Sequence, residues 1–334
     1  MAGRRTNLAL LLLGAAALAS GVLAFAIGTS WSRWPVVAHA VAGIAMVLLV
    51  PWKSVIVGRG LRRARSGRFS SILLGILVTV AIVSGMLFST GLVLRYGPLT
   101  AIQVHVGSAL IALPLAVWHV RVRPVKPRRI DLARRNVLRA GGLLAGATAL
   151  YVTAEGVVRL VSLPGARRRF TGSHERGSFR PEAMPVTQWF NDRVQRIDPA
   201  SWTLIVRDSG GSREWSRDEL VALDDRVTAT LDCTGGWYAT QEWTGVGLDR
   251  LVSPGEGHSL FVKSATGYSR RFPIEDLPNL WLATGVGGRP LSRGHGFPAR
   301  IVAPGRRGFW WVKWVTEIRV DERAWWLQPP FPLT

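Results

Sequence analysis

The stretch "PLSRGHGFPARIVAPGRRGFWWVKWVTEIRV", residues 290–320, decides how the second half of this chain folds. Its pattern predicts a Gly/Pro loop, a strand, a basic turn and a second strand. Basic side chains gather along one edge of this loop: His295, Arg300, Arg306, Arg307 and Lys313. Such a group suits an anionic ligand such as a phosphate, although a solvated basic surface is the ordinary alternative.

The chain has a single cysteine, Cys233, in the upstream stretch "LDCTGGWYATQEWTG". One thiol excludes an internal disulfide, a cysteine-rich iron–sulfur cluster and a c-type haem attachment motif. A lone cysteine is most often an inert small hydrophobic residue. If a metal is bound through sulfur here, the protein supplies one thiolate.

The segment 170–334 is predicted to form one compact α+β domain, because it is polar, rich in Trp and Pro, and contains several short apolar runs. The predicted strands are 203–208, 227–233, 259–265, 299–304 and 312–320. Short helices are expected at 216–223, where Ser216 and Glu219 have capping-box spacing, and at 246–252. No internal repeat is evident in the chain.

The first half of the chain is predicted to span a membrane. Its apolar runs reach the ~20 residues that a helix needs to cross the hydrocarbon core, and they are 8–27, 35–52, 72–94, 99–120 and, more weakly, 140–163. The net charge of +21 would otherwise suit nucleic acid, but the charge-free runs favour a membrane partner and no nucleic acid. We therefore expect an all-α bundle of about five helices, divided into a four-helix bundle at 1–125 and a fifth helix within 126–165.

The distribution of Lys and Arg predicts the orientation of these helices. Sixteen basic residues lie before the first run or in the second–third and fourth–fifth connections, against two in the opposite loops. Basic loops stay in the cytoplasm. We therefore expect a multi-pass protein of a bacterial plasma membrane, with 170–334 on the extracytoplasmic side. Arg134 and Arg135, followed by a small-residue apolar run, resemble an internal twin-arginine export signal, although positive-inside charge alone would explain them. Glu155 and Arg159 are spaced so that they could pair along the fifth helix or reach the membrane interface.

Two histidines of the first half are candidate haem ligands. His39 and His105 lie near the start of the second and fourth runs, at the same expected depth, which suits bis-imidazole ligation of haem b. His119 lies about 21 Å further along the helix of His105, where no second histidine is available to partner it. The alternative is that these are ordinary interfacial histidines.

Together, the Cys233 stretch and the downstream block resemble the molybdopterin-binding domain of the sulfite oxidase family over most of 187–320. The resemblance rests on the cysteine, a Trp-x-Gly segment at 243–245, the "GHGFPARIVAPG" block and "VKW". It implies that Cys233 is catalytic and ligates molybdenum beside two dithiolene sulfurs of one pterin. It further implies that the cofactor is held by Asn191, His295, Arg300, Trp311, Val312 and Lys313. The helical half weakly resembles haem-binding subunits of b-type cytochromes.

Departures from the family pattern bear on the substrate. Sulfite-oxidising members have arginines near the oxyanion, whereas the corresponding places here read Phe190 and "TGGWYAT", and the chain ends at Thr334 without their dimerisation domain. The sequence looks more like the bacterial methionine sulfoxide reductase branch.

We therefore expect a membrane-anchored molybdenum oxidoreductase that transfers oxygen atoms on a small extracytoplasmic substrate, with sulfoxide or N-oxide reduction favoured. Electrons would be exchanged with the quinone pool or another electron-transfer protein. The alternatives are sulfite-type oxidation, helices that serve only as an anchor, and a cofactor-free binding or sensor protein.

Overall fold

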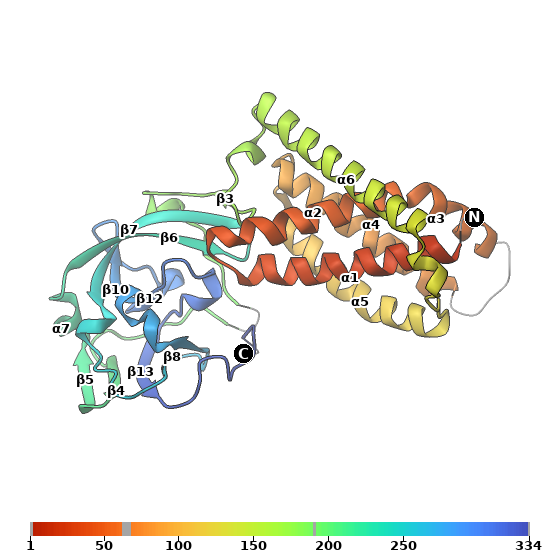
Figure 1. The fold of residues 1–334 in the computed structure, drawn as a ribbon. Coiled ribbons are helices and arrows are strands. Elements are labelled where there is room, and N and C mark those ends of the chain that lie inside the picture. Colours follow the sequence, from red (N-terminus) through yellow and green to blue (C-terminus); the bar gives the residue numbers. More distant parts are fainter. Residues whose placement is uncertain (1–2, 62–67, 190–191, 333–334) are drawn as a thin grey trace. The chain divides into compact units, whose positions relative to one another are not determined.

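The computed structural model describes residues 3–61, 68–189 and 192–332. The chain divides into a helical unit, formed by residues up to 25 and 30–174, and a sheet-rich unit, formed by 26–29 and 175–334 (Figure 1). The predicted combination of amino-terminal helices and a carboxy-terminal α+β domain is thereby confirmed.

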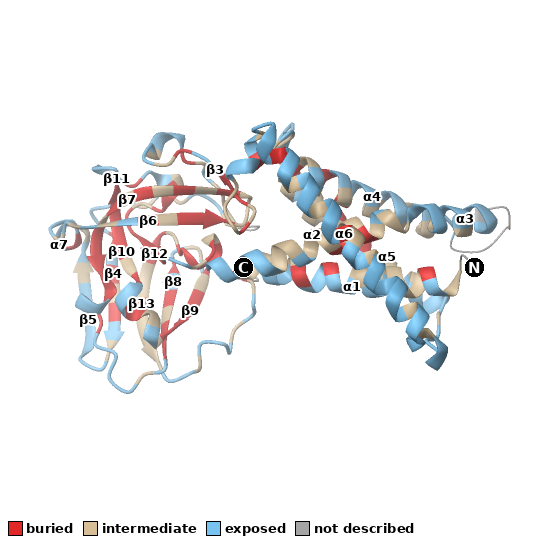
Figure 2. Cartoon of the chain, turned by 45° about the horizontal axis from the view of Figure 1, so that its top comes forward, coloured by how far each residue is buried: buried red, intermediate tan, exposed pale blue. Residues whose placement is uncertain are grey.

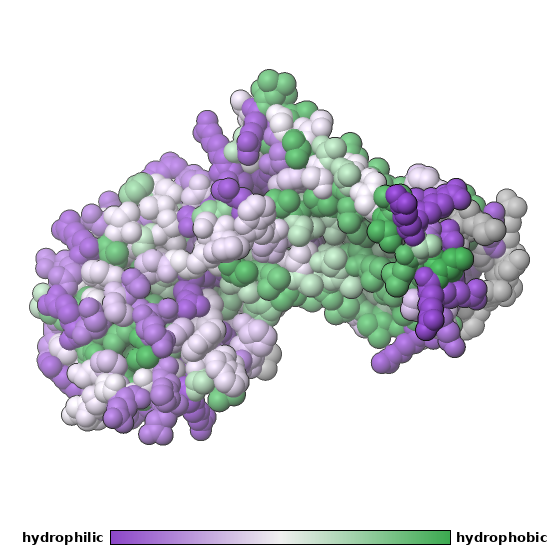
Figure 3. Space-filling view, viewed as in Figure 1, coloured by the Kyte–Doolittle hydropathy of each residue, from purple (hydrophilic) through white to green (hydrophobic). Residues whose placement is uncertain are grey.

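The helical unit consists of long, apolar helices. They are α1 (Arg4–Ala26), α2 (Arg33–Leu48), α3 (Val50–Leu61), α4 (Arg68–Thr90), α5 (Ala101–Val122) and α6 (Arg134–Leu160). Five segments, 4–26, 30–48, 68–90, 101–122 and 134–160, are long and apolar enough to cross a membrane. Hydrophobic residues cover the visible face of these helices, while hydrophilic residues gather at the end that carries the amino terminus (Figure 3).

Short elements join the helices, and they are η1 (Ser30–Ser32), β1 (Arg95–Tyr96), β2 (Leu99–Thr100), η2 (Arg129–Leu132) and η3 (Pro164–Arg167). Thr100 and Gln103 form a capping box that fixes the start of α5. The predicted run 35–52 is interrupted, because α2 ends at Leu48 and α3 begins at Val50. The expected pairing of Glu155 with Arg159 is wrong, because Glu155 pairs with Arg168.

The helical unit contains an internal repeat that the sequence analysis missed. Helices α1 and α4 share the pattern Ala-x-x-Ser-Gly, at 17–21 and 81–85. Ser20 and Ser84 each donate a hydrogen bond to the carbonyl four residues earlier, both at 2.6 Å. The pairs α1–α2 and α4–α5 thus repeat one helical hairpin in their sequence motif, although α5 packs much more closely on α4 than α2 does on α1. Most apolar positions of a membrane helix accept any apolar residue, so the copies share few letters.

The sheet-rich unit contains two sheets. One has the order β5-β4-β13-β8-β9 and consists of β4 (Thr203–Asp208), β5 (Gly211–Ser216), β8 (Ser259–Ser264), β9 (Ser269–Pro273) and β13 (Val315–Asp321). The other has the order β11-β10-β7-β3, with β12 paired to β10 and β6 paired to β7. Its strands are β3 (His174–Glu175), β6 (Asp225–Cys233), β7 (Trp237–Gly247), β10 (Trp281–Val286), β11 (Arg289–Pro290) and β12 (Arg300–Val302).

Helical turns connect these strands, and they are η4 (Pro181–Ala183), α7 (Arg217–Val221), η5 (Leu248–Arg250), η6 (Ile274–Asn279), η7 (Arg293–His295) and η8 (Gly308–Trp310). The five predicted strands are confirmed, and so is the capping box of Ser216 and Glu219. The predicted helix at 246–252 is wrong, since β7 runs to Gly247 and only the single turn η5 follows. Strands β5, β7, β9 and β10 were not predicted.

Buried residues concentrate in the strands of the sheet-rich unit, whereas the helices bury few (Figure 2). Trp243, Trp311 and Trp314 are at most 2% exposed and are the largest side chains of this core. In the helices the buried positions are mostly small residues such as Ala45 and Ala101. Outward apolar side chains are what a membrane-spanning bundle requires, because lipid is as apolar as they are.

Candidate functional site

Cys233 lies where strand β6 turns into strand β7. Its strand partner is Trp237, so three residues make the turn, and Gly236 takes the positive φ that such turns need. The Cys233 side chain is buried, and the Gly235 N–H points at its Sγ at 3.3 Å. Burial raises the pKa of the thiol, while the Gly235 N–H and the charge of Arg307 act in the opposite direction. The turn therefore presents one buried sulfur that is already partly supported as a thiolate.

Three residues of the "GHGFPAR…VKW" block, a histidine, an arginine and a lysine, gather near this sulfur. His295 ends η7, Arg300 begins β12, and Lys313 precedes β13. The Arg300 guanidinium donates to the carbonyls of His295, at 3.1 Å, and Trp311, at 3.3 Å. Lys313 Nζ donates to the Gly294 carbonyl at 2.7 Å. Cys233 interacts electrostatically with Arg300 and Lys313, so the cluster and the thiol form one site.

The site carries positive charge that the described residues do not neutralise by a direct ion pair. Arg300 and Lys313 donate only to neutral oxygens there, and Arg300 Nε is buried without a hydrogen-bond partner in the described part of the chain. Burial and then Arg300 lower the pKa of Lys313 to about 7, and burial lowers that of Arg300 to about 9. Burial, Arg300 and Lys313 lower the pKa of His295 to about 4. Buried cations that repel one another favour an anionic ligand.

These residues fit a molybdenum–pterin cofactor. A pterin phosphate would neutralise the cations, and dithiolene sulfurs would supply metal ligands that the chain lacks. Among residues 3–61, 68–189 and 192–332 no group of three or more His, Cys, Asp or Glu could hold a metal ion alone. A metal at Cys233 must therefore bring most of its ligands with it. One soft thiolate then completes the set.

Other predicted residues lie elsewhere or act through their backbone. The side chains of Trp311 and Val312 are buried in the core, and their carbonyls accept hydrogen bonds from Arg300 and from the Ile301 N–H. Cofactor contact by these two residues stays a prediction. Asn191 lies outside the described residues.

The basic loop edge expected at 290–320 is only partly a cluster. Arg306 pairs with Asp276, and Arg307 pairs with Asp232, so neither guanidinium gathers with His295 and Lys313 as a binding group. Arg306 and Arg307 thus already have carboxylate partners, and an anion site formed by His295, Arg300 and Lys313 stays a prediction. Acidic partners far away in sequence could not be assigned from the pattern.

Thr187 belongs to the site although the sequence analysis did not single it out. Its Oγ1 accepts from Trp237 Nε1 at 3.0 Å, and its carbonyl accepts from Lys313 Nζ at 2.9 Å. Its side chain also interacts with Cys233. No local pattern marks this threonine, because its partners come from two distant segments, the β6–β7 turn and the residues before β13.

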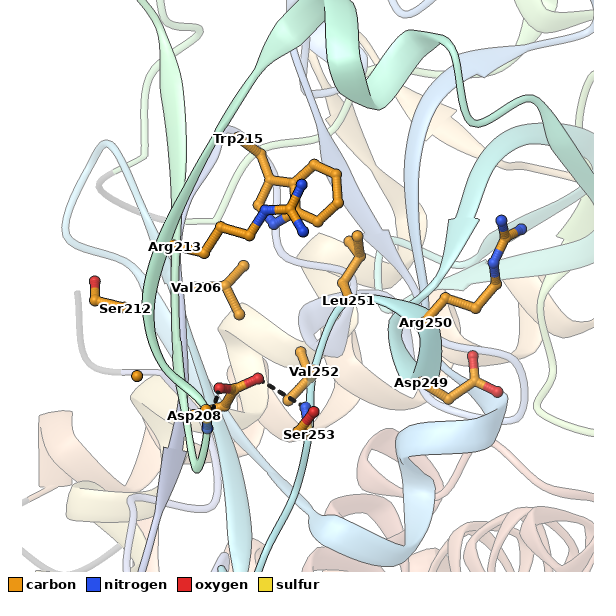
Figure 4. A pocket seen from close by; sticks show the side chains of 12 residues that line it. Val206, Asp208, Ser212, Arg213, Trp215, Asp249, Arg250, Leu251, Val252 and Ser253 are labelled. Atoms are coloured by element: carbon orange, nitrogen blue, oxygen red, sulfur yellow. Dashed lines mark hydrogen bonds between the residues drawn. The ribbon is translucent and has the colours of Figure 1, made fainter.

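A cavity of about 290 Å³ lies elsewhere in the sheet-rich unit. Its walls come from the β4–β5 hairpin and η5, where the Arg213 guanidinium lies 3.5 Å over the Trp215 ring (Figure 4). None of its lining residues belongs to the Cys233 site. The cavity therefore does not locate the chemistry.

In the helical unit the structure brings His39 and His105 together, with ring centroids 5.5 Å apart. His39 Nδ1 bonds the Ala17 carbonyl at 2.8 Å, and His105 Nδ1 bonds the Ala81 carbonyl at 2.7 Å. A carbonyl can only accept, so each Nδ1 carries the proton and each Nε2 keeps a lone pair. This is the arrangement typical of metal-ligating histidines.

Glycines of the repeated motif make room for these rings. A Cβ added at Gly21 would lie 3.2 Å from the ring of His39, and one added at Gly85 would lie 2.8 Å from Nδ1 of His105. The two histidines are equivalent positions of the repeated hairpin, and each is seated on its own glycine. The pair thus fits the axial ligands of one haem.

The repeat also explains why His119 lacks a histidine partner. The position that corresponds to His119 is Lys53, which lies in α3 just after the first hairpin. Lys53 Nζ donates to Asn7 Oδ1 at 3.0 Å, and His119 Nδ1 lies 3.2 Å from Ser71 Oγ, at equivalent places of α1 and α4. The pairs Lys53–Asn7 and His119–Ser71 therefore occupy equivalent positions but differ in their chemistry.

Comparison with known proteins assigns the sheet-rich unit. Residues 191–326 match the family described as "Oxidoreductase molybdopterin binding domain". Rat mitochondrial sulfite oxidase is 29% identical over 170 residues, covering 38% of this chain and 30% of that protein. The catalytic subunit MsrP of a protein-methionine-sulfoxide reductase from Xanthomonas axonopodis pv. citri is 32% identical over 150 residues, covering 36% and 45%. MsrP of Burkholderia mallei is 24% identical over 249 residues, covering 62% and 73%.

Among solved structures, the sulfane dehydrogenase SoxCD of Paracoccus pantotrophus matches with a TM-score of 0.37 and 26% identity, over 39% of this chain and 41% of that one. The chain spans about a third of the length of the sulfite oxidases that it matches. Within these bounds, the sheet-rich unit is a molybdopterin-binding oxidoreductase domain of the sulfite oxidase family.

Proposed function

We propose that this protein is a membrane-anchored molybdenum oxidoreductase that transfers an oxygen atom to or from a small extracytoplasmic substrate. The observation that carries the proposal is the single buried thiol of Cys233 beside the neutral His295 and the basic side chains of Arg300 and Lys313, which make no direct ion pair within the described residues. The proposed organisation is a helical bundle at 1–125, an export signal and fifth helix at 126–165, and the catalytic domain at 170–334.

Each residue has a distinct task in this proposal. When bound, the molybdenum cofactor supplies two-electron oxygen-atom transfer chemistry. The Cys233 thiolate ligates the metal, and the Gly235 N–H helps to hold its sulfur. Arg300 and Lys313 hold the pterin phosphate, and His295 stays neutral near pH 7, so it can donate or accept a hydrogen bond. The buried walls, which include Trp237, exclude water from the metal side.

A neutral oxo-substrate, such as a sulfoxide or N-oxide, is favoured over sulfite. Three of the arginines that could hold a dianion are engaged elsewhere, whereas Arg293 is exposed to solvent. Arg271 and Arg307 are in ion pairs, and Arg270 donates to the Pro329 carbonyl and lies over the Trp310 ring. A dianion bound without such partners would lose its hydration at a cost of several kcal/mol.

The helices are proposed to carry electrons through one haem b held by His39 and His105. The protonated Nδ1 atoms and the seats at Gly21 and Gly85 support this assignment. The donor or acceptor would be the quinone pool or another electron-transfer protein. Helices that serve only as an anchor remain the competing arrangement.

Metal analysis and substrate competition test the proposal. The purified protein should contain about one molybdenum per chain, since one cysteine ligates one metal. Cys233→Ser should abolish turnover while the far-ultraviolet dichroism of the protein stays unchanged. A methyl sulfoxide should be reduced with a higher kcat/KM than that with which sulfite is oxidised. Full activity of the Ser variant would refute the site, and faster sulfite oxidation would move the substrate assignment to the sulfite type.

A further inference from the structure

A buried ion pair lies directly beside the reactive cysteine. Asp232 is the residue before Cys233, and its Oδ1 accepts a hydrogen bond from Arg307 Nη1. The two side chains are 2% and 4% exposed. The adjacent Arg306 pairs with Asp276 instead, where the side chains are 28% and 26% exposed. Of these two neighbouring arginines, only Arg307, which lies at Cys233, is buried.

Arg307 and its neighbours are attached to the end of β6 in three ways. Arg307 Nη2 donates to the Cys233 carbonyl at 3.3 Å. The backbones of Asp232 and Arg307 form a parallel bridge. Gly308 packs so closely that an added Cβ would lie 3.0 Å from Cys233 Cα. The turn that contains Arg307 therefore packs against the backbone of Cys233 and hydrogen-bonds to it.

The direction of the Cys233 sulfur depends on this backbone. Its carbonyl accepts two hydrogen bonds, one from Arg307 and one from the Gly236 N–H at 3.1 Å. A buried ion pair adds little net stability, because desolvation offsets the attraction. Stability alone is thus a weak reason for this pair at this place. The Arg307 charge also acts on the Cys233 thiol, whose pKa it lowers against the effect of burial, since charges interact strongly in a dry interior.

We propose that the Asp232–Arg307 ion pair is a positioning device for the metal ligand Cys233. The pair fixes the direction of the thiolate and balances the charge around it. It thereby sets the geometry of the sulfur–molybdenum bond and the redox potential of the molybdenum. The inference rests on the proposed role of Cys233 as the ligand. Asp232 and Arg307 are positioning residues, because they act through the cysteine.

Two single variants of the full-length protein test the charge balance. In Asp232→Asn the remaining Arg307 cation should stabilise the electron-rich reduced metal, so the molybdenum midpoint potential should rise. In Arg307→Met the remaining carboxylate should lower that potential. Both should retain molybdenum, change the electron paramagnetic resonance signature of Mo(V), and reduce kcat by about 10- to 100-fold with little change in KM.

A third variant separates geometry from charge. Arg307→Lys keeps the positive charge but shortens the reach toward the Cys233 carbonyl. Its potential should stay near that of the wild type, while its Mo(V) signature should change. The matched controls are Asp321→Asn and Arg271→Met, from an ion pair of the other sheet whose side chains are 13% and 8% exposed. These controls should lose comparable stability yet keep the wild-type potential and signature.

The outcomes distinguish this inference from the proposed function. Equal potentials in Asp232→Asn and Arg307→Met, or a shift of both in one direction, would overturn the positioning role. The same holds if both variants keep the wild-type Mo(V) signature and lose only stability. If instead the wild type contains no molybdenum, or Cys233→Ser keeps the wild-type signature, the proposed function itself has failed.

Discussion

Replacing Gly85 or Gly21 by alanine should lower the haem content of the helical unit, and the loss should be larger for Gly85. Gly85→Ala places a Cβ 2.8 Å from Nδ1 of His105, and ordinary van der Waals contact begins at 3.4 Å. The ring must therefore move by about 0.6 Å, because close-packed interiors do not absorb such overlaps. The movement strains the 2.7 Å bond from His105 Nδ1 to the Ala81 carbonyl. Loss of such a partner typically weakens metal binding about 10- to 100-fold.

The equivalent change in the other hairpin should be milder. In Gly21→Ala the nearest ring atoms of His39 lie 3.2 Å away, so a shift of about 0.2 Å suffices. Gly14 and Gly75, in the same helices, face open space and are the controls. Alanine favours a helix over glycine by about 1 kcal/mol, so haem lost from Gly85→Ala cannot be attributed to a weakened helix.

The assay is the dithionite-reduced minus oxidised spectrum of purified protein, normalised to protein concentration. Haem content should fall in the order Gly75→Ala and Gly14→Ala (as wild type), Gly21→Ala, then Gly85→Ala. Full haem in Gly85→Ala would refute the seat assigned to His105. An equal loss in Gly75→Ala would show that the effect belongs to the helix and not to the ring.

Three further predictions concern other parts of the chain. His119→Ala should leave the reduced haem band unchanged, because Lys53 occupies the position that a second bis-histidine site would need; a second lost band would show another haem. Changing Arg134 and Arg135 to Lys keeps the positive charge that determines membrane topology. Retention of the catalytic domain in the cytoplasm would then identify an export signal, whereas normal export would show that the pair acts only through its charge. In the cofactor-free protein the pKa of His295 is lowered from 6.5 to about 4, so the unfolded state binds the proton at a higher pH than the folded state does. The free energy of unfolding should therefore fall as the pH drops from 6.5 to about 4, by up to about 3 kcal/mol. His295→Gln should flatten that dependence in urea titrations, and an unchanged slope would contradict it.

The sequence was sufficient where one segment determines its own structure. Apolar runs predicted the membrane-length helices, and apolar stretches such as 203–208 predicted strands, because burial pattern is a local property. Strand β7 was missed because the polar residues Thr240, Gln241 and Glu242 interrupt the stretch "WYATQEWTG", and its long pairing with β6 is what makes it a strand. At 246–252 the pairing of β7 with β10 overrode a helix-like pattern.

The candidate site followed the same division. Cys233, His295, Arg300 and Lys313 could be named from the sequence because they belong to segments with a recognisable pattern. Thr187 and the Asp232–Arg307 pair could not, since each depends on contact between segments far apart in the chain. The fold determines which acidic residue pairs with a given arginine, and sequence spacing does not predict it.

The repeated hairpin also bears on how the helical unit is assembled. Each hairpin orients its own histidine, through Ala17 and Gly21 in the first and Ala81 and Gly85 in the second. Neither ring needs the other hairpin to fix its tautomer. During synthesis at the ribosome, the first hairpin is made before the second. Assembly then requires only that the two separately formed hairpins meet in the membrane. An iron bound between their histidines would hold the hairpins together.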